Sequence, residues 1–123
     1  MEVQRTVGHR SHRPLPWMAF GIGGFLVAFF FPVHIFLFGI ALPLGWFATP
    51  DYQSALHLLH APLTRIYLGI LLIFAFFHAG YRLRDTICDA FDVRRLDTII
   101  MALCFGAAIA GSLYTIALLA SVP

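Results

Sequence analysis

The sequence predicts an all-α integral membrane protein that crosses the bilayer three times, on the evidence of its composition, its hydropathy and the spacing of its charges. Of its 123 residues, 60% are apolar and 11% are charged, and the mean hydropathy is +0.85. A soluble domain carries roughly a quarter charged residues, so this chain has too few charges to cover a surface that faces water. The formal net charge of +2 is too small to indicate a nucleic-acid-binding protein.

Uncharged stretches define the three spans. Asp, Glu, Lys and Arg are absent from residues 17–48, 66–81 and 98–123. About 20 apolar residues in a helix cross the roughly 30 Å of hydrocarbon in a bilayer, and backbone groups in lipid must form their hydrogen bonds within the segment. We therefore predict an N-terminal tail over 1–16 and a three-helix transmembrane domain over 17–123, with spans at about 17–43, 62–83 and 98–120.

The ends of these spans carry their own signals. Leu42, Pro43 and Gly45 break the first span, and Pro62 suits the first turn of the second, where its missing N–H costs nothing. Asp97 is a candidate N-cap for the third span. Residues 54–60 form a candidate amphipathic segment on the outer surface.

The arginines predict the orientation. The side that we assign to the cytoplasm would hold Arg5, Arg10, Arg13, Arg82, Arg84, Arg94 and Arg95. The positive-inside rule then places the N-terminus and the loop after span two in the cytoplasm, and the C-terminus outside. The N-terminal order of arginines and apolar residues resembles a signal peptide, but the apolar run is too long and lacks a small-residue cleavage site. We expect a retained helix.

Four residues raise the question of metal or disulfide chemistry. Cys88 in the predicted loop and Cys104 in the third span share no metal-binding spacing, so neither a disulfide nor a metal site is expected. His57 and His60 have a spacing that can chelate a metal, yet no third ligand lies nearby in the outer loop. Solvated side chains are the favoured interpretation there.

His34 and His78 lie within spans, where ionisable residues are candidates for function. Paired histidines in membrane helices can hold a haem. At 1.5 Å per residue, His34 lies near the outer face and His78 about 6 Å from Arg82 at the inner face, so one iron cannot reach both. We therefore expect no haem in this chain alone, with sharing of one histidine with a partner chain as the alternative. A structural alternative for His34 is a hydrogen bond to a backbone carbonyl that Pro32 frees.

Two further features leave alternatives open. Small residues recur at Gly21, Gly23, Gly24 and Ala28, and in the pairs Gly106/Ala110 and Ala107/Gly111. Such spacing lets helices approach closely, either within the chain or against a partner. The charged segment 82–97 places Asp85 with Asp89 on one helical face, and Ile87, Phe91 and Arg95 on another. It is either a solvated extension of span two or a docking surface for a soluble subunit.

An ordered set of residues in the first half resembles a known family. The set consists of Pro14, Trp17, Phe20-Gly21-x-Gly23-Gly24, Pro32-Val33 and Gly39-Ile40-x-Leu42-Pro43-Leu44-Gly45-x-Phe47, with Gly80-Tyr81-Arg82-Leu83 at the end of span two. It resembles the D subunit of quinol:fumarate reductase, a small membrane anchor. The resemblance covers about 35 residues specifically, and the length and three-span layout agree throughout.

The resemblance implies a four-subunit respiratory complex in a bacterial inner (cell) membrane. This chain would pack against a second three-helix anchor (C) and attach a flavoprotein (A) and an iron–sulfur subunit (B), having no catalytic centre of its own. The two anchors would help to bind menaquinol or a similar quinol near the cytoplasmic face, commonly without haem. The family's tryptophan at the start of span one matches Trp17. Tyr81 stands where the family has a histidine associated with the site, and its hydroxyl can still donate a hydrogen bond to a quinone carbonyl.

The candidate quinone-site wall therefore comprises Trp17, His78, Tyr81 and Arg82, all predicted at the inner membrane edge. Alternatives are the anchor of a succinate:quinone reductase, working in the opposite direction, and a small membrane protein that is no part of an enzyme, such as a transporter component or an assembly factor. A transporter usually carries a carboxylate within a span, and the three spans contain none.

Overall fold

The structure, a computed structural model, describes residues 14–122, and the predicted tail up to residue 13 lies outside the described part. Four α-helices follow one another: α1 (Pro14–Phe36), α2 (Tyr52–His60), α3 (Pro62–Ala90) and α4 (Asp97–Ser121). Three segments are long and apolar enough to cross a membrane: Trp17–Ala41, Pro62–Ala90 and Arg94–Ser121. The all-helical fold with three candidate spans is confirmed.

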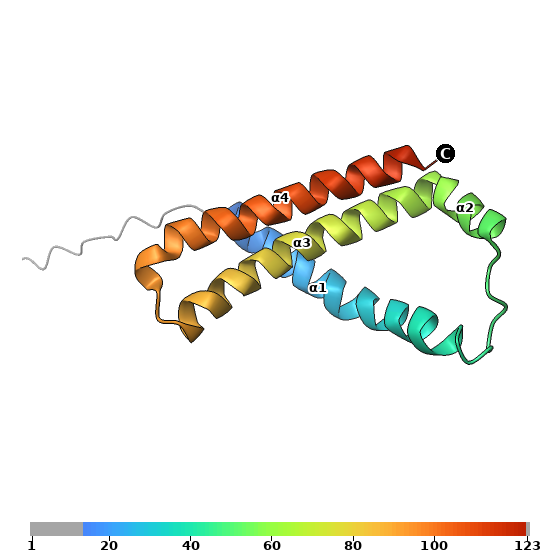
Figure 1. Ribbon diagram of the computed structural model, residues 1–123, viewed down its shortest axis with the longest axis horizontal. Coiled ribbons are helices and arrows are strands. Elements are labelled where there is room, and N and C mark those ends of the chain that lie inside the picture. Colours follow the sequence, from blue (N-terminus) through green and yellow to red (C-terminus); the bar gives the residue numbers. More distant parts are fainter. Residues whose placement is uncertain (1–13, 123) are drawn as a thin grey trace, which may run out of the picture.

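The three long helices form an open bundle. α3 and α4 run side by side along most of their length, whereas α1 crosses α3 and then diverges from it toward the loop before α2 (Figure 1). Few side chains are buried within the chain; the core consists of Ala41, Leu71, Cys88, Cys104 and Ala108. The large apolar side chains on the outside are suited to lipid or to neighbouring subunits, since a membrane helix buries apolar surface in hydrocarbon.

Small residues determine where the helices meet. A Cβ atom on Gly23 would lie 2.5 Å from the Phe74 carbonyl oxygen, so only glycine allows α1 to cross α3 at this height. A Cβ atom on Gly80 would lie 3.1 Å from the Cys104 carbonyl oxygen, where α3 meets α4. Around Gly21 and Gly106, by contrast, a Cβ atom would meet nothing within 4 Å. Packing within the chain thus explains part of the small-residue pattern. It does not explain Gly21 and Gly106, which have no close neighbour in the chain.

The end of the bundle between α1 and α3 is built from turns and a short helix. α1 passes into a π-helical turn, Leu37–Ala41, and the chain reverses at Gly45, whose φ of +73° favours glycine. The Asp51 carboxylate accepts a hydrogen bond from the Ser54 N–H at 2.9 Å and caps α2. Pro62 lies in the first turn of α3, as predicted. The predicted amphipathic segment is thus a helix that begins slightly earlier than expected.

Three details of the segment after span two differ from the prediction. α3 continues to Ala90, so Cys88 lies in a buried position on the helix and not in a loop. Because α3 ends there, Ile87, Phe91 and Arg95 do not share one helical face. Asp97 is the first residue of α4 and not its N-cap. Its carboxylate accepts a hydrogen bond from Arg84 on α3, because a guanidinium is a stronger partner than a backbone N–H.

Candidate functional site

The four predicted wall residues come from two helices. Trp17 lies near the start of α1, and His78, Tyr81 and Arg82 lie in the second half of α3. The spacing of three and four residues puts the α3 members along one stripe of that helix. Trp17 is 72% exposed and Arg82 is exposed as well, whereas His78 and Tyr81 are half-buried.

Phe20 connects the two helices at this site. Its ring stacks on the His78 imidazole, with the ring centres 4.7 Å apart, and lies 4.9 Å from the Tyr81 ring. Phe20 follows Trp17 by three residues, so the two lie about 5 Å apart along the axis of α1 and on neighbouring faces. Phe20 thus brings the start of α1 to the same end of α3 as His78 and Tyr81.

His78 is held firmly against α1. Its Nδ1 lies 3.1 Å from the Phe20 carbonyl oxygen, and because a carbonyl only accepts, Nδ1 carries the proton and donates. The imidazole also lies against the backbone of Gly24, where an added Cβ atom would come within 2.9 Å of His78 Cε1. The imidazole thus fixes the position at which α1 crosses α3.

Tyr81 is positioned from both sides. Phe20 of α1 lies on one side, and Phe105 of α4 lies on the other at 6.0 Å between ring centres, with the rings nearly perpendicular. This aromatic packing limits the directions in which the phenol ring can point. The sequence interpretation did not assign a role to Phe20 or Phe105. For Phe20, its spacing of three residues from Trp17 was the one signal in the sequence. For Phe105 the sequence offers no signal.

His34 lies elsewhere. Its Nδ1 donates to the Phe30 carbonyl oxygen at 2.7 Å, and the Tyr67 hydroxyl lies 3.3 Å from its Nε2. His34 thus bonds to a backbone carbonyl, but the predicted acceptor was wrong. The carbonyl that loses its N–H partner at Pro32 is that of Ala28, by the i to i−4 rule. Tyr67 and His78 are separated by about 16 Å along α3. The two histidines are therefore not brought together.

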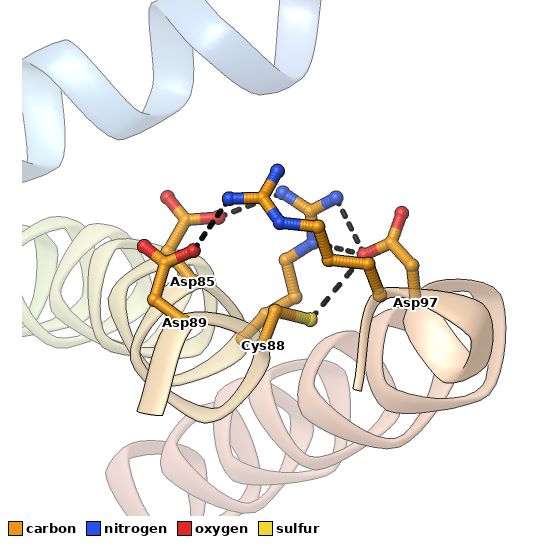
Figure 2. Close-up of a pocket in the computed structure, with 6 residues that line it drawn as sticks. Asp85, Cys88, Asp89 and Asp97 are labelled. Atoms are coloured by element: carbon orange, nitrogen blue, oxygen red, sulfur yellow. Dashed lines mark hydrogen bonds and ion pairs between the residues drawn. The ribbon is translucent and has the colours of Figure 1, made fainter. Parts of the chain in front are cut away.

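A second polar group of residues closes the hairpin between α3 and α4. Arg84 donates from Nε to Asp97 Oδ1 at 2.7 Å and from Nη1 to Asp85 Oδ1 at 2.7 Å. The Cys88 thiol donates to the same Asp97 oxygen at 3.6 Å. Figure 2 shows this group around a small pocket, with Asp97 facing Cys88 across the hairpin. All the charges on its walls have partners of opposite sign, which is typical of a structural network.

At the end of the bundle near α2, Arg65 links three segments. Its guanidinium donates to the carbonyl oxygens of Leu59 at 2.8 Å and Val122 at 3.3 Å, and lies 3.3 Å from His60 Nδ1. His57 is exposed, in keeping with the interpretation as a solvated side chain. In the described residues no three His, Cys, Asp or Glu side chains are grouped to hold a metal ion.

The chain is similar to one family over nearly its whole length. The model of the family of fumarate reductase D subunits matches residues 7–120. The fumarate reductase D subunits of Mycobacterium tuberculosis (strain H37Rv) and Mycobacterium bovis (strain AF2122/97) are each 37% identical over 103 residues, which are 84% of this chain and 82% of theirs. No solved structure matches the chain at a significant level. Together with the three candidate spans, these matches establish that the chain belongs to the family of fumarate reductase D subunits.

Proposed function

We propose that this chain, as the D anchor of quinol:fumarate reductase, forms one wall of a quinol head-group site where α1 crosses α3. Membership of the family implies the other fumarate reductase subunits as partners. In the proposal these are a flavoprotein, an iron–sulfur subunit and a second anchor. The observation that carries the proposal is the contact of Phe20 with both His78 and Tyr81, one helical turn from Trp17.

The chemistry of the substrate supports this location. A quinol gives up two electrons and two protons, so its head group needs polar partners near water, while its isoprenoid tail stays in hydrocarbon. Trp17 and Tyr81 offer an indole N–H and a phenol O–H as donors, and Arg82 adds a positive charge at the membrane edge. His78 takes part by holding Phe20 and the α1 backbone in place, since its Nδ1 is already bonded to Phe20. Trp17 and Arg82 are exposed, so in this proposal partner subunits form the opposite wall of the quinol site.

In this proposal the chain does not bind a haem by itself. One haem would need both histidines within reach of it, but Tyr67, which contacts His34, lies about 16 Å from His78 along α3. The iron–sulfur subunit would receive the electrons directly from the quinol, and from there they would reach the flavoprotein and fumarate. We therefore place the anchor's function in positioning the quinol and attaching the water-soluble subunits.

Removal of the Tyr81 hydroxyl tests this site. In Tyr81→Phe the rings of Phe20 and Phe105 keep their contacts, and one hydrogen bond to the quinol is lost, which is worth about 1 kcal/mol. We expect kcat/KM for quinol oxidation to fall by roughly 3- to 10-fold, with fumarate reduction from an artificial electron donor unchanged. Tyr67→Phe is the matched control, because Tyr67 lies on the same helix and bonds to His34. An equal effect of both changes would contradict the site.

The orientation is tested by reporters at the C-terminus. With seven arginines on the proposed inner side and an odd number of spans, we expect the C-terminus outside the cytoplasm. A fused reporter that is active only outside should work, and one that is active only in the cytoplasm should not. Strong activity of the cytoplasmic reporter would reverse the orientation and with it the side on which the quinol site lies.

A further inference from the structure

The hairpin between α3 and α4 extends beyond the membrane. α3 has 29 residues, which is about 43 Å of helix against roughly 30 Å of hydrocarbon. Arg82 is the first charged residue after the apolar stretch of α3, and Phe91 lies about 13 Å farther along the axis. A head-group layer adds roughly 5–8 Å on each side, and a tilt of about 20° shortens the projection by less than a tenth. The tip of the hairpin therefore stands in water.

This tip is rigid. Asp92 turns the chain with a φ of +49°, and the Leu96 N–H donates to the Val93 carbonyl oxygen at 2.8 Å. Arg94 then reaches back to Asp89 on the last turn of α3 at 2.8 Å. Below these bonds, the bond from Arg84 to Asp97 joins the two helices (Figure 2). A surface that is already ordered loses less conformational entropy when it binds a partner.

The tip exposes apolar side chains where no lipid can cover them. Phe91 is 73% exposed and Leu96 is 49% exposed. The segment 82–97 contains four arginines and four aspartates, so it has no excess positive charge to attract anionic lipid head groups. Membrane helices of another anchor would contact the chain below this height. A water-soluble protein is the partner that fits an aromatic side chain on a rigid, charge-balanced tip, because such residues are enriched in the cores of protein interfaces.

We infer that Phe91 is the central contact by which the anchor binds the water-soluble iron–sulfur subunit, with Leu96 on the same hairpin as a further contact. The inference rests on the proposed function, because it requires that the iron–sulfur subunit accept electrons from a quinol bound close to Tyr81. Tyr81 and Phe91 lie about 15 Å apart along α3, so one protein seated on the hairpin also covers the proposed quinol site. The contact would hold the first electron acceptor at a fixed distance from the quinol.

A photo-crosslinking amino acid at position 91 tests the contact in the assembled complex. With Phe91→p-benzoylphenylalanine, we expect illumination to join this chain to the iron–sulfur subunit, identified by mass spectrometry. The matched control is the same change at Phe25, which is 68% exposed on α1 within the span and should react with lipid or membrane helices. An adduct from position 91 only with lipid, with the second anchor or with another copy of this chain would overturn the inference.

Truncation of the side chain gives a second test. Phe91→Ala should weaken the binding of the soluble subunits by roughly 10- to 30-fold, as expected for an aromatic residue at an interface centre, while the amount of anchor in the membrane stays normal. Phe91→Leu should restore most of the binding. Full retention of the soluble subunits by Phe91→Ala would overturn this inference but would not contradict the proposed function. A wild-type preparation that never carries fumarate reductase subunits would instead contradict the proposed function, and the inference with it.

Discussion

Gly23→Ala is expected to destabilise the bundle by about 1–3 kcal/mol, the usual effect of forcing a methyl group into a packed contact. The added Cβ atom would lie 2.5 Å from the Phe74 carbonyl oxygen and 2.9 Å from His78 Cβ. The first of these is backbone and cannot rotate away, so α1 must move off α3. The displacement would separate Phe20 from His78 and Tyr81, and quinol oxidation should fall together with stability.

Two glycines provide controls for this prediction. Gly21→Ala and Gly106→Ala add the same methyl group in helices, at positions where it meets nothing within 4 Å. Alanine is the better helix former, so both changes should be neutral or slightly stabilising within this chain. The measurement is the apparent Tm of the purified complex in detergent, with quinol activity alongside. Equal Tm values for Gly21→Ala and Gly23→Ala would contradict the crossing of α1 and α3 at Gly23.

The spans were predictable from the sequence because hydropathy depends on composition and length alone. The end of α3 was predictable only in part, since an extension of span two was one of two interpretations of residues 82–97. Charged residues 82–90 lower the hydropathy and resemble a loop, but the structure continues the helix there. Arg84 and Arg94 form ion pairs with Asp97 and Asp89, which neutralise charge on this extension. Local sequence patterns do not identify a partner that lies 13 residues away, as Asp97 does from Arg84.

Asp97 shows the same limit on a single residue. Its place before an apolar helix is typical of an N-cap, and the sequence offers no sign that Arg84 will approach from α3. The side chain therefore joins two helices where it was expected to cap one. The π-helical turn at Leu37–Ala41 was likewise not foreseen, because no residue type specifies it.

The placement of the candidate residues was predictable in part, and their role in a quinol site stays a proposal. Counting residues at 1.5 Å per position placed Trp17, His78 and Tyr81 at the same end of their helices. In the structure Phe20, three residues after Trp17, contacts both His78 and Tyr81. The same count placed His34 and His78 far apart along the helices. The structure agrees, because His34 contacts Tyr67 while His78 contacts Phe20. The role of Phe20 itself depends on the angle at which α1 crosses α3. That angle is set by the bare backbone at Gly23 and Gly24, which periodicity does not reveal.

Trp17 is, in the proposed function, part of a quinol site and more than an interfacial anchor, a role common for tryptophan at membrane edges. In Trp17→Leu an apolar side chain remains at the lipid boundary, but the indole N–H and the flat ring are lost. One hydrogen bond with some packing is worth about 1–2 kcal/mol. We therefore expect kcat/KM for quinol oxidation to fall by roughly 5- to 30-fold, because the loss is confined to the site.

The deciding measurement compares two electron donors in the same assembled Trp17→Leu complex. The proposed site predicts slow oxidation of quinol, together with normal fumarate reduction from an artificial donor and normal amounts of all subunits in the membrane. An anchoring role alone would give the opposite pattern, in which less complex remains in the membrane while each remaining complex oxidises quinol at the normal rate. Normal quinol kinetics in the assembled variant would remove Trp17 from the site and contradict the proposed wall.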